Sequence, residues 1–120
     1  MPKIKVMYNP TITSLQVGVI IFKEDDYIFT YCPSLDLIGY GETEKRAKES
    51  FNIVVDEYVR YTSENGTLIE DLTERGWKIR EDKTVIPPTM ARSLRSNKEF
   101  GNIINKYDFK KQSIPLAIPV

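Results

Sequence analysis

Apolar and polar positions in the first third of the chain follow patterns typical of β-strands. Residues 3–8 alternate strictly, which predicts an edge strand with one drier face. Residues 17–22, VGVIIF, are apolar at nearly every position, as in a central strand covered on both faces. Residues 27–32 form a β-rich run after the charged turn 23–26, so the two runs predict a hairpin. Residues 37–40 predict a further strand.

The period changes to that of a helix after Thr43, and the apolar stripe predicts packing on the sheet. A helix over 43–64 is predicted, with a length of about 33 Å at the standard rise. Asn65 and Gly66 are suited to the left-handed conformation that ends a helix. The members of the stripe are Ala47, Phe51, Val54, Tyr58 and Tyr61.

The rest of the chain contains short elements. Thr67 and Glu70 have capping-box spacing, which predicts a short helix that ends at Gly76, and residues 77–79 are predicted to return to the sheet as a fourth strand. After the break at Pro87 and Pro88 the pattern predicts short helices, followed by a terminal extended segment. These helices are predicted over residues 89–94 and 97–106, and the extended segment is SIPLAIPV.

These elements predict an α+β fold: a small antiparallel sheet of three to four strands, one long helix on a face, and short C-terminal helices with a terminal strand. We expect an α/β domain over residues 1–82 and a C-terminal extension over 83–120. The terminal segment suits docking on its own sheet, on a symmetry mate or on a partner. Of these we favour strand exchange into a homodimer or higher homo-oligomer.

Composition limits the class of protein. The chain has 120 residues, enough for one domain, and 17 basic residues balance 17 acidic ones. A net charge of zero gives no general attraction to nucleic acid or to an anionic membrane. One cysteine cannot form an internal disulfide, and no apolar run has the length of a signal peptide core or a membrane span. We expect a cytoplasmic protein without a membrane partner.

The complete absence of histidine narrows the chemistry further. Histidine is the usual general base and the commonest metal ligand, so Cys–His and Ser–His mechanisms and the usual zinc sites are excluded. Carboxylate chemistry remains, with or without a hard metal ion. Turn and helix-cap chemistry explains the candidate acids better than a magnesium site does, so we expect no enzyme, cofactor or metal. These acids are Asp25, Asp26, Asp36, Glu42 and Glu44.

The stretch YCPSLDLIGYGETEKRA, residues 31–47, offers a candidate nucleophile in Cys32. Without a histidine to activate it, a buried structural thiol is the better interpretation. Gly39 and Gly41 do not complete a phosphate-binding motif, and we expect them to permit a tight turn from strand to helix. Thr43 is then the helix N-cap, and acids on both sides of it suit the helix dipole.

In order and spacing, these features resemble the HicB antitoxin family and the HicB-like N-terminal domain over residues 17–61. The resemblance implies a partial RNase H-like fold without the nuclease's metal site. It also implies binding and neutralisation of a HicA-type toxin that cleaves mRNA, often with repression of the shared operon. Arg46 departs from the family's usual glutamate, and the C-terminal third contains no recognisable DNA-reading motif. The residues that carry the resemblance are Tyr31, Pro33, Leu35, Gly41, Glu42, Thr43 and Ala47.

The leading hypothesis is therefore a non-catalytic protein that covers the toxin with its sheet edge and with the loop 33–41. The predicted partner-binding residues are Tyr31, Leu35, Asp36 and Tyr40.

Two alternatives remain. The first is a regulator that binds operator DNA or other nucleic acid through the basic C-terminal region, with Arg92, Arg95 and Lys98 as contacts. A solvated basic face is the more common interpretation of that region, because Glu99 and Asp108 interrupt the run of basic residues. The second alternative ranks last: a carboxylate–metal nuclease on an RNase H-like frame, using Asp36, Glu42 and Glu44.

Overall fold

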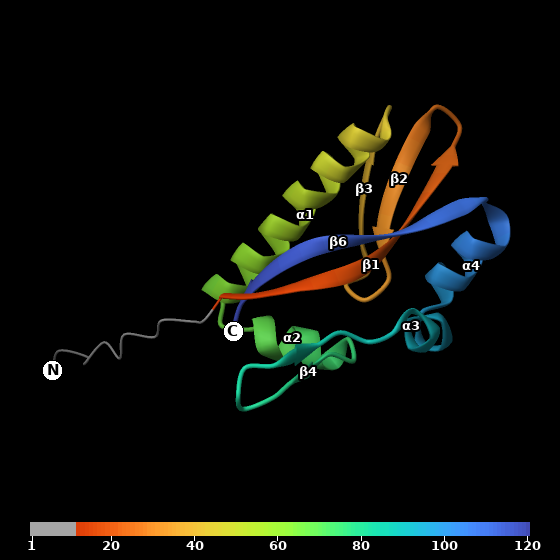
Figure 1. The fold of residues 1–120 in the computed structure, drawn as a ribbon. Coiled ribbons are helices and arrows are strands. Elements are labelled where there is room, and N and C mark those ends of the chain that lie inside the picture. The colour runs from red at the N-terminus through yellow and green to blue at the C-terminus, as the bar shows by residue number, and fades with distance from the viewer. Residues whose placement is uncertain (1–11) are drawn as a thin grey trace, which may run out of the picture.

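A four-stranded antiparallel sheet with a long helix on one face forms the centre of the computed structural model, which describes residues 12–120 (Figure 1). This confirms the predicted fold class. The predicted strand over 3–8 lies outside the described residues. The elements are β1 (Ile12–Glu24), β2 (Tyr27–Cys32), β3 (Leu37–Gly41), α1 (Glu44–Glu64), α2 (Leu68–Glu74), β4 (Lys78–Ile79), β5 (Val85–Ile86), α3 (Met90–Ser96), α4 (Lys98–Lys106) and β6 (Phe109–Pro119).

The strand order of the main sheet is β3-β2-β1-β6. As predicted, β1 is central, but it begins at Ile12 and is longer than the apolar run alone indicated. Nearly its whole length pairs with β6, in a register that runs from Ile12 opposite Pro119 to Phe22 opposite Phe109. The terminal segment thus docks on the sheet of its own chain, and strand exchange between chains stays a prediction.

Helix α1 begins as predicted. The Thr43 side chain accepts a hydrogen bond from the Arg46 backbone N–H at 3.1 Å, which satisfies one free donor of the first turn. Ala47, Phe51 and Val55 are the buried apolar residues of its inner face. The predicted stripe was wrong in its second half, because Val55 is buried in place of Val54, and Thr62 in place of the exposed Tyr61.

Gly39 and Gly41 are needed for close packing and not for a special turn. The only described glycines with positive φ are Gly66 and Gly76, at the ends of the two predicted helices. A Cβ on Gly39 would lie 2.2 Å from the Phe51 backbone nitrogen, well inside contact distance. The two glycines of β3 therefore let α1 lie directly against the sheet, which corrects the sequence-based explanation.

The predicted fourth strand was misplaced. Lys78 pairs with Ile86 and Ile79 with Val85, so β4 and β5 form a separate two-stranded sheet, and β6 completes the main one. Trp77, just before β4, is almost fully buried in the core. The capping box of α2 does not form either, because the Thr67 side chain makes no cap bond.

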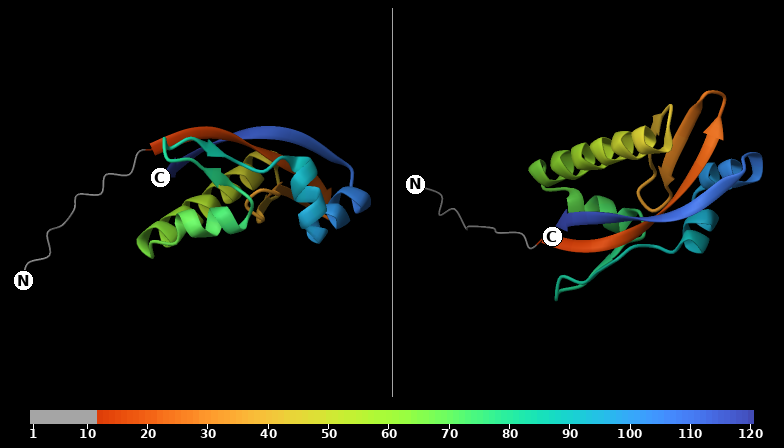
Figure 2. Two further views of the ribbon diagram at one scale, coloured as in Figure 1. Left: turned by 90° about the horizontal axis from the view of Figure 1, so that it is seen from below. Right: turned by 45° about the horizontal axis from the view of Figure 1, so that its top comes forward.

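Two apolar clusters cover the two faces of the sheet. One contains Val17 and Val19 of β1 and is closed by α1, α2 and Trp77. The other contains Ile20, Phe22 and Tyr31 and is closed by Phe100 and Ile103 of α4. Both views of Figure 2 show α1 and the pair α3–α4 on opposite sides of β2. The predicted C-terminal extension thus supplies a sheet strand and a packing layer.

None of the described helices combines the length and the apolar character that a membrane crossing needs.

We predict that Gly39→Ala destabilises the fold by about 3 kcal/mol, because the new methyl group meets the α1 backbone, which cannot move without loss of packing. The measurement is the free energy of unfolding in urea. Gly101→Ala in α4 is the matched control: its Cβ would meet Leu94 at an ordinary 3.8 Å, so helix propensity should leave stability unchanged or raise it by up to about 1 kcal/mol. Equal effects of the two substitutions would contradict this role of Gly39.

Candidate functional site

Cys32 lies at the end of β2 and is fully buried. Burial raises the pKa of its thiol, although hydrogen bonds from Ser34 and from the loop backbone act in the other direction. Its Sγ lies 3.3 Å from the Ser34 Oγ. A protonated, enclosed thiol is a poor nucleophile, so the geometry fits the structural interpretation of Cys32.

The loop between β2 and β3 is fixed by two side chains from the segment that directly follows α2. Trp77 Nε1 donates to the Ser34 carbonyl at 2.8 Å, and an Arg75 guanidinium nitrogen donates to the Leu35 carbonyl at 2.6 Å. Both bonds join segments far apart in sequence. The loop therefore has a structural role, and two of its backbone carbonyls accept hydrogen bonds from side chains of the same chain.

Arg75 is itself held in place by Asp71 and Tyr58. Its Nε lies 2.8 Å from the Asp71 carboxylate, and Tyr58 donates its hydroxyl proton to the same carboxylate. Burial alone would raise the pKa of Asp71, but these two hydrogen bonds outweigh it and lower the pKa. Burial, with the bond to Asp71, raises the pKa of Tyr58. Asp71 thus stays ionised as an anchor.

A second set of bonds ties the loop to the start of α4. Tyr31 donates its hydroxyl to Asp36 Oδ1 at 2.6 Å, and Asn97 Nδ2 donates to the Tyr31 oxygen at 2.6 Å. Asn97 also caps α4 through its side-chain oxygen, which accepts from Glu99 and Phe100. Burial, followed by the bond to Asp36, raises the pKa of Tyr31. The phenol therefore keeps its proton and serves as a bridge.

The four predicted partner-binding residues do not lie together on one exposed surface. Tyr31 is 2% exposed and Leu35 is 1% exposed, so neither side chain lies on a surface, which corrects their predicted role. Packing accounts for both: Tyr31 lies against Phe100, and Leu35 lies in the core closed by α1 and α2. Asp36 is exposed but engaged with Tyr31. Only Tyr40, at 58% exposure, presents a free aromatic surface.

The strand register brings together an aromatic row that the sequence pattern alone did not indicate. Tyr40 is opposite Phe29, Phe29 is opposite Phe22, and Phe22 is opposite Phe109, so one aromatic from each strand lies in line. The Phe22 and Phe29 rings stack at 5.2 Å, and Tyr107 stacks on Phe22 at 4.9 Å. Each aromatic was visible in the sequence, but their alignment depends on a register that involves β6.

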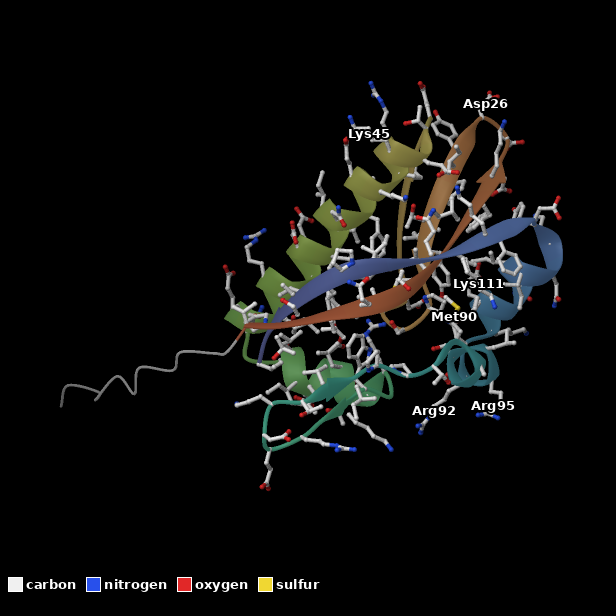
Figure 3. All side chains as sticks on the ribbon, in the orientation of Figure 1. Asp26, Lys45, Met90, Arg92, Arg95 and Lys111 are labelled. Atoms are coloured by element: carbon white, nitrogen blue, oxygen red, sulfur yellow. The ribbon has the colours of Figure 1, made fainter. Side chains whose placement is uncertain are left out.

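One end of this row is uncovered. Tyr27, Ile38 and Tyr40 are 43%, 41% and 58% exposed, and we call these three residues the aromatic corner. Tyr27 and Tyr40 meet edge to face, with ring centres 5.7 Å apart. Asp25 and Asp26 form the exposed turn just before Tyr27, where Figure 3 shows Asp26 at the tip of the hairpin. An apolar surface with an acidic rim results.

The sheet edges are less available than this face. The Tyr40 backbone N–H on β3 donates to the Ser50 side chain of α1 at 3.2 Å. Pro115 and Pro119 lie in β6, the other edge strand, and proline lacks the donor that an added strand would need. A groove of about 550 Å³ runs between β6 and α1, lined partly by Lys48, Asp56 and Pro115. The open part of the sheet's aromatic face is the aromatic corner.

Arg92, Arg95 and Lys98, predicted as nucleic-acid contacts, are exposed on α3 and at the start of α4. Figure 3 shows Arg92 and Arg95 pointing away from the sheet. Within residues 12–120, no carboxylate forms an ion pair with any of the three, whereas Lys110 pairs with Glu44 at 2.6 Å. They lie close along the chain and form a basic surface distinct from the aromatic corner.

The candidate acids are not arranged as a metal site. In the part of the chain that the structure describes, no group of three or more Asp, Glu or Cys residues is arranged to hold a metal ion. Asp36 bonds to Tyr31, and Glu44 pairs with Lys110 at the first turn of α1.

No protein-family model matches the chain, and no curated protein or solved structure is significantly similar to it.

We predict that Cys32 reacts with a thiol reagent such as DTNB only as fast as the folded protein opens, because its thiol is buried and its pKa is raised. Raising the pH to 9 should therefore accelerate the native reaction little, while denaturant should make it immediate. A Cys32→Ala/Ser63→Cys variant, with its thiol on the exposed side of α1, is the control and should react at once. Rapid native labelling of Cys32 would contradict its structural role.

Proposed function

We propose that this protein is a non-catalytic, antitoxin-like protein of the cytoplasm, which binds and neutralises a HicA-type mRNA-cleaving toxin. The order of its elements supports the proposal: an apolar hairpin, a loop that contains Pro33, and a helix capped by Thr43 that lies on one face of the sheet. We further propose that the sheet with α1 is a partial RNase H-like frame. In this proposal the frame serves as a binding surface.

The aromatic corner is the observation that carries the proposal. Contiguous exposed aromatic and aliphatic side chains with a polar rim are typical of protein-binding surfaces. Tyrosine is among the residues that contribute most to binding energy when a partner covers it. Here two tyrosines and Ile38 lie exposed on one face of β2 and β3, with Tyr40 between Tyr27 and Ile38.

Neutralisation by this surface needs no chemistry in the antitoxin. A specific complex buries roughly 800 Å² on each partner, enough to close the active face of a small nuclease. The corner stands on strands held by Gly39 against α1 and by the bonded loop, so it is rigid before the partner arrives. A rigid surface loses little conformational entropy on binding, which favours a tight complex.

We predict that the protein copurifies with the product of the adjacent gene and rescues growth when that product is toxic. Tyr40→Ala should weaken the complex by about tenfold or more, because it removes an aromatic contact that a partner would bury. Tyr61→Ala is the matched control, since Tyr61 is at least as exposed as Tyr40 but lies on α1, away from the corner. Affinity is measured by titration calorimetry.

Failure of both copurification and growth rescue would contradict the antitoxin proposal. A complex weakened more by Tyr61→Ala than by Tyr40→Ala would place the interface on α1 instead.

The second candidate function is a nucleic-acid-binding regulator, and a specific observation favours it. Residues 90–120 contain six basic and two acidic residues, and three of the basic ones form the unpaired surface of α3 and α4. Operator DNA is the proposed ligand. A homodimer, including one formed by exchange of β6, would present two such surfaces to a two-fold symmetric site.

For this candidate we predict binding to the protein's own promoter that weakens steeply as salt rises. Arg92→Ala/Arg95→Ala should reduce the salt dependence by about two charges, one for each lost phosphate contact. Lys45→Ala, on the exposed start of α1, is the control. Fluorescence anisotropy with labelled promoter DNA provides the measurement, and no binding at low salt would eliminate the candidate.

A further inference from the structure

We propose that the aromatic corner and its acidic rim form a receptor for arginine side chains on a basic protein partner. The identity of that partner rests on the proposed function, but the chemistry of the receptor rests on the geometry alone. The same surface thus provides an apolar contact and a preference for positive charge.

The aromatic part of the receptor is preformed. Tyr27 and Tyr40 meet at an interplanar angle of 81°, so the edge of one ring packs against the face of the other, and both rings stay partly exposed. Phe29 lies behind Tyr40, with ring centres 6.0 Å apart, and Phe22 stacks on Phe29 almost in parallel. The exposed rings are thus supported by the partly buried Phe29 and the buried Phe22. A guanidinium group can stack on such a ring without any rearrangement of the protein.

The acidic part of the receptor lies at the end of the same two strands. Asp25 and Asp26 are the exposed residues of the β1–β2 turn, directly before Tyr27. Glu42 is exposed and follows Gly41, which pairs with Ile28, the neighbour of Tyr27. The three carboxylates therefore lie at the rim of the corner. None of them forms an ion pair with a described lysine or arginine, and the only described cation whose charge acts on one of them is Lys106, which pairs with Glu24 and is also attracted by Asp25.

Arginine matches this combination better than lysine does. Its planar guanidinium can stack on an aromatic face and still direct paired N–H donors at a carboxylate, whereas an ammonium group is a strongly hydrated point charge. The approach of a cationic partner is also favoured at long range by the clustered negative charge. The partner that fits this receptor is therefore a protein with a basic surface rich in arginine.

The chain supplies a control surface of the same charge. Glu70 and Glu74 are exposed on α2 beside the exposed Ile69, and α2 contains no aromatic residue. Neutralisation of these two acids changes the net charge by as much as neutralisation of Asp26 and Glu42. Any difference between the two variants therefore reports the aromatic corner and not charge alone.

The test is titration of the ¹⁵N-labelled full chain with an oligoarginine peptide, followed by NMR. We expect saturable shifts of the amides of residues 25–28 and 38–42. Asp26→Asn/Glu42→Gln and Tyr40→Ala should each weaken binding by about fivefold or more, whereas Glu70→Gln/Glu74→Gln should leave it within about twofold. An oligolysine peptide of equal length should bind more weakly.

Three results would overturn the inference. The shifts could fall on α2 or on α1, both double variants could weaken binding equally, or the corner could shift with protein concentration in the absence of peptide, which would assign it to a second copy of the chain. These outcomes are separate from the proposed function. If the protein binds oligoarginine but no toxin, only the antitoxin role is rejected. If it binds the toxin but no oligoarginine, only the receptor is rejected.

Discussion

The pairing of β1 with β6 is the constraint on which the rest of the structure depends. Eleven consecutive register pairs join the first described strand to the last, from Ile12 opposite Pro119 to Phe22 opposite Phe109. This ladder makes β1 a central strand and brings Ile114, Leu116 and Ile118 into the core that α1 and α2 close. Val120, the last residue of the chain, is fully buried there. The main sheet cannot be complete until the end of the chain is in place.

The same ladder determines which surfaces stay open. With β6 on one edge and α1 against β3 on the other, both edges are protected, and the helices α3 and α4 cover the middle of the remaining face. Tyr107 closes the aromatic row over Phe22, but nothing in the described chain extends over Tyr27 and Tyr40. The uncovered corner is thus a consequence of where the C-terminal layer ends.

Local sequence signals predicted the local structure well. The strand over 27–32 and the Thr43 cap follow from side-chain alternation and from cap chemistry, which act over a few residues. The errors concern long-range contacts. The segment after Trp77 was assigned to the wrong sheet because two residues carry too little pattern to choose a partner. The burial of Tyr31 and Leu35 could not be predicted locally, because their partners come much later in the chain. Asn97 and Phe100 contact Tyr31, and the α2 region covers Leu35. The aromatic row needed the register of all four strands.

The central claim, that this protein acts by covering a partner with the aromatic corner, is tested most directly by hydroxyl-radical footprinting of the complex with the adjacent gene's product. Oxidation of each tyrosine side chain, read by mass spectrometry, reports its exposure. We expect Tyr27 and Tyr40 to lose most of their reactivity in the complex while Tyr61, exposed on α1, keeps its own. Unchanged oxidation of Tyr27 and Tyr40, with protection confined to Tyr61 or to the α3–α4 segment, would contradict the account.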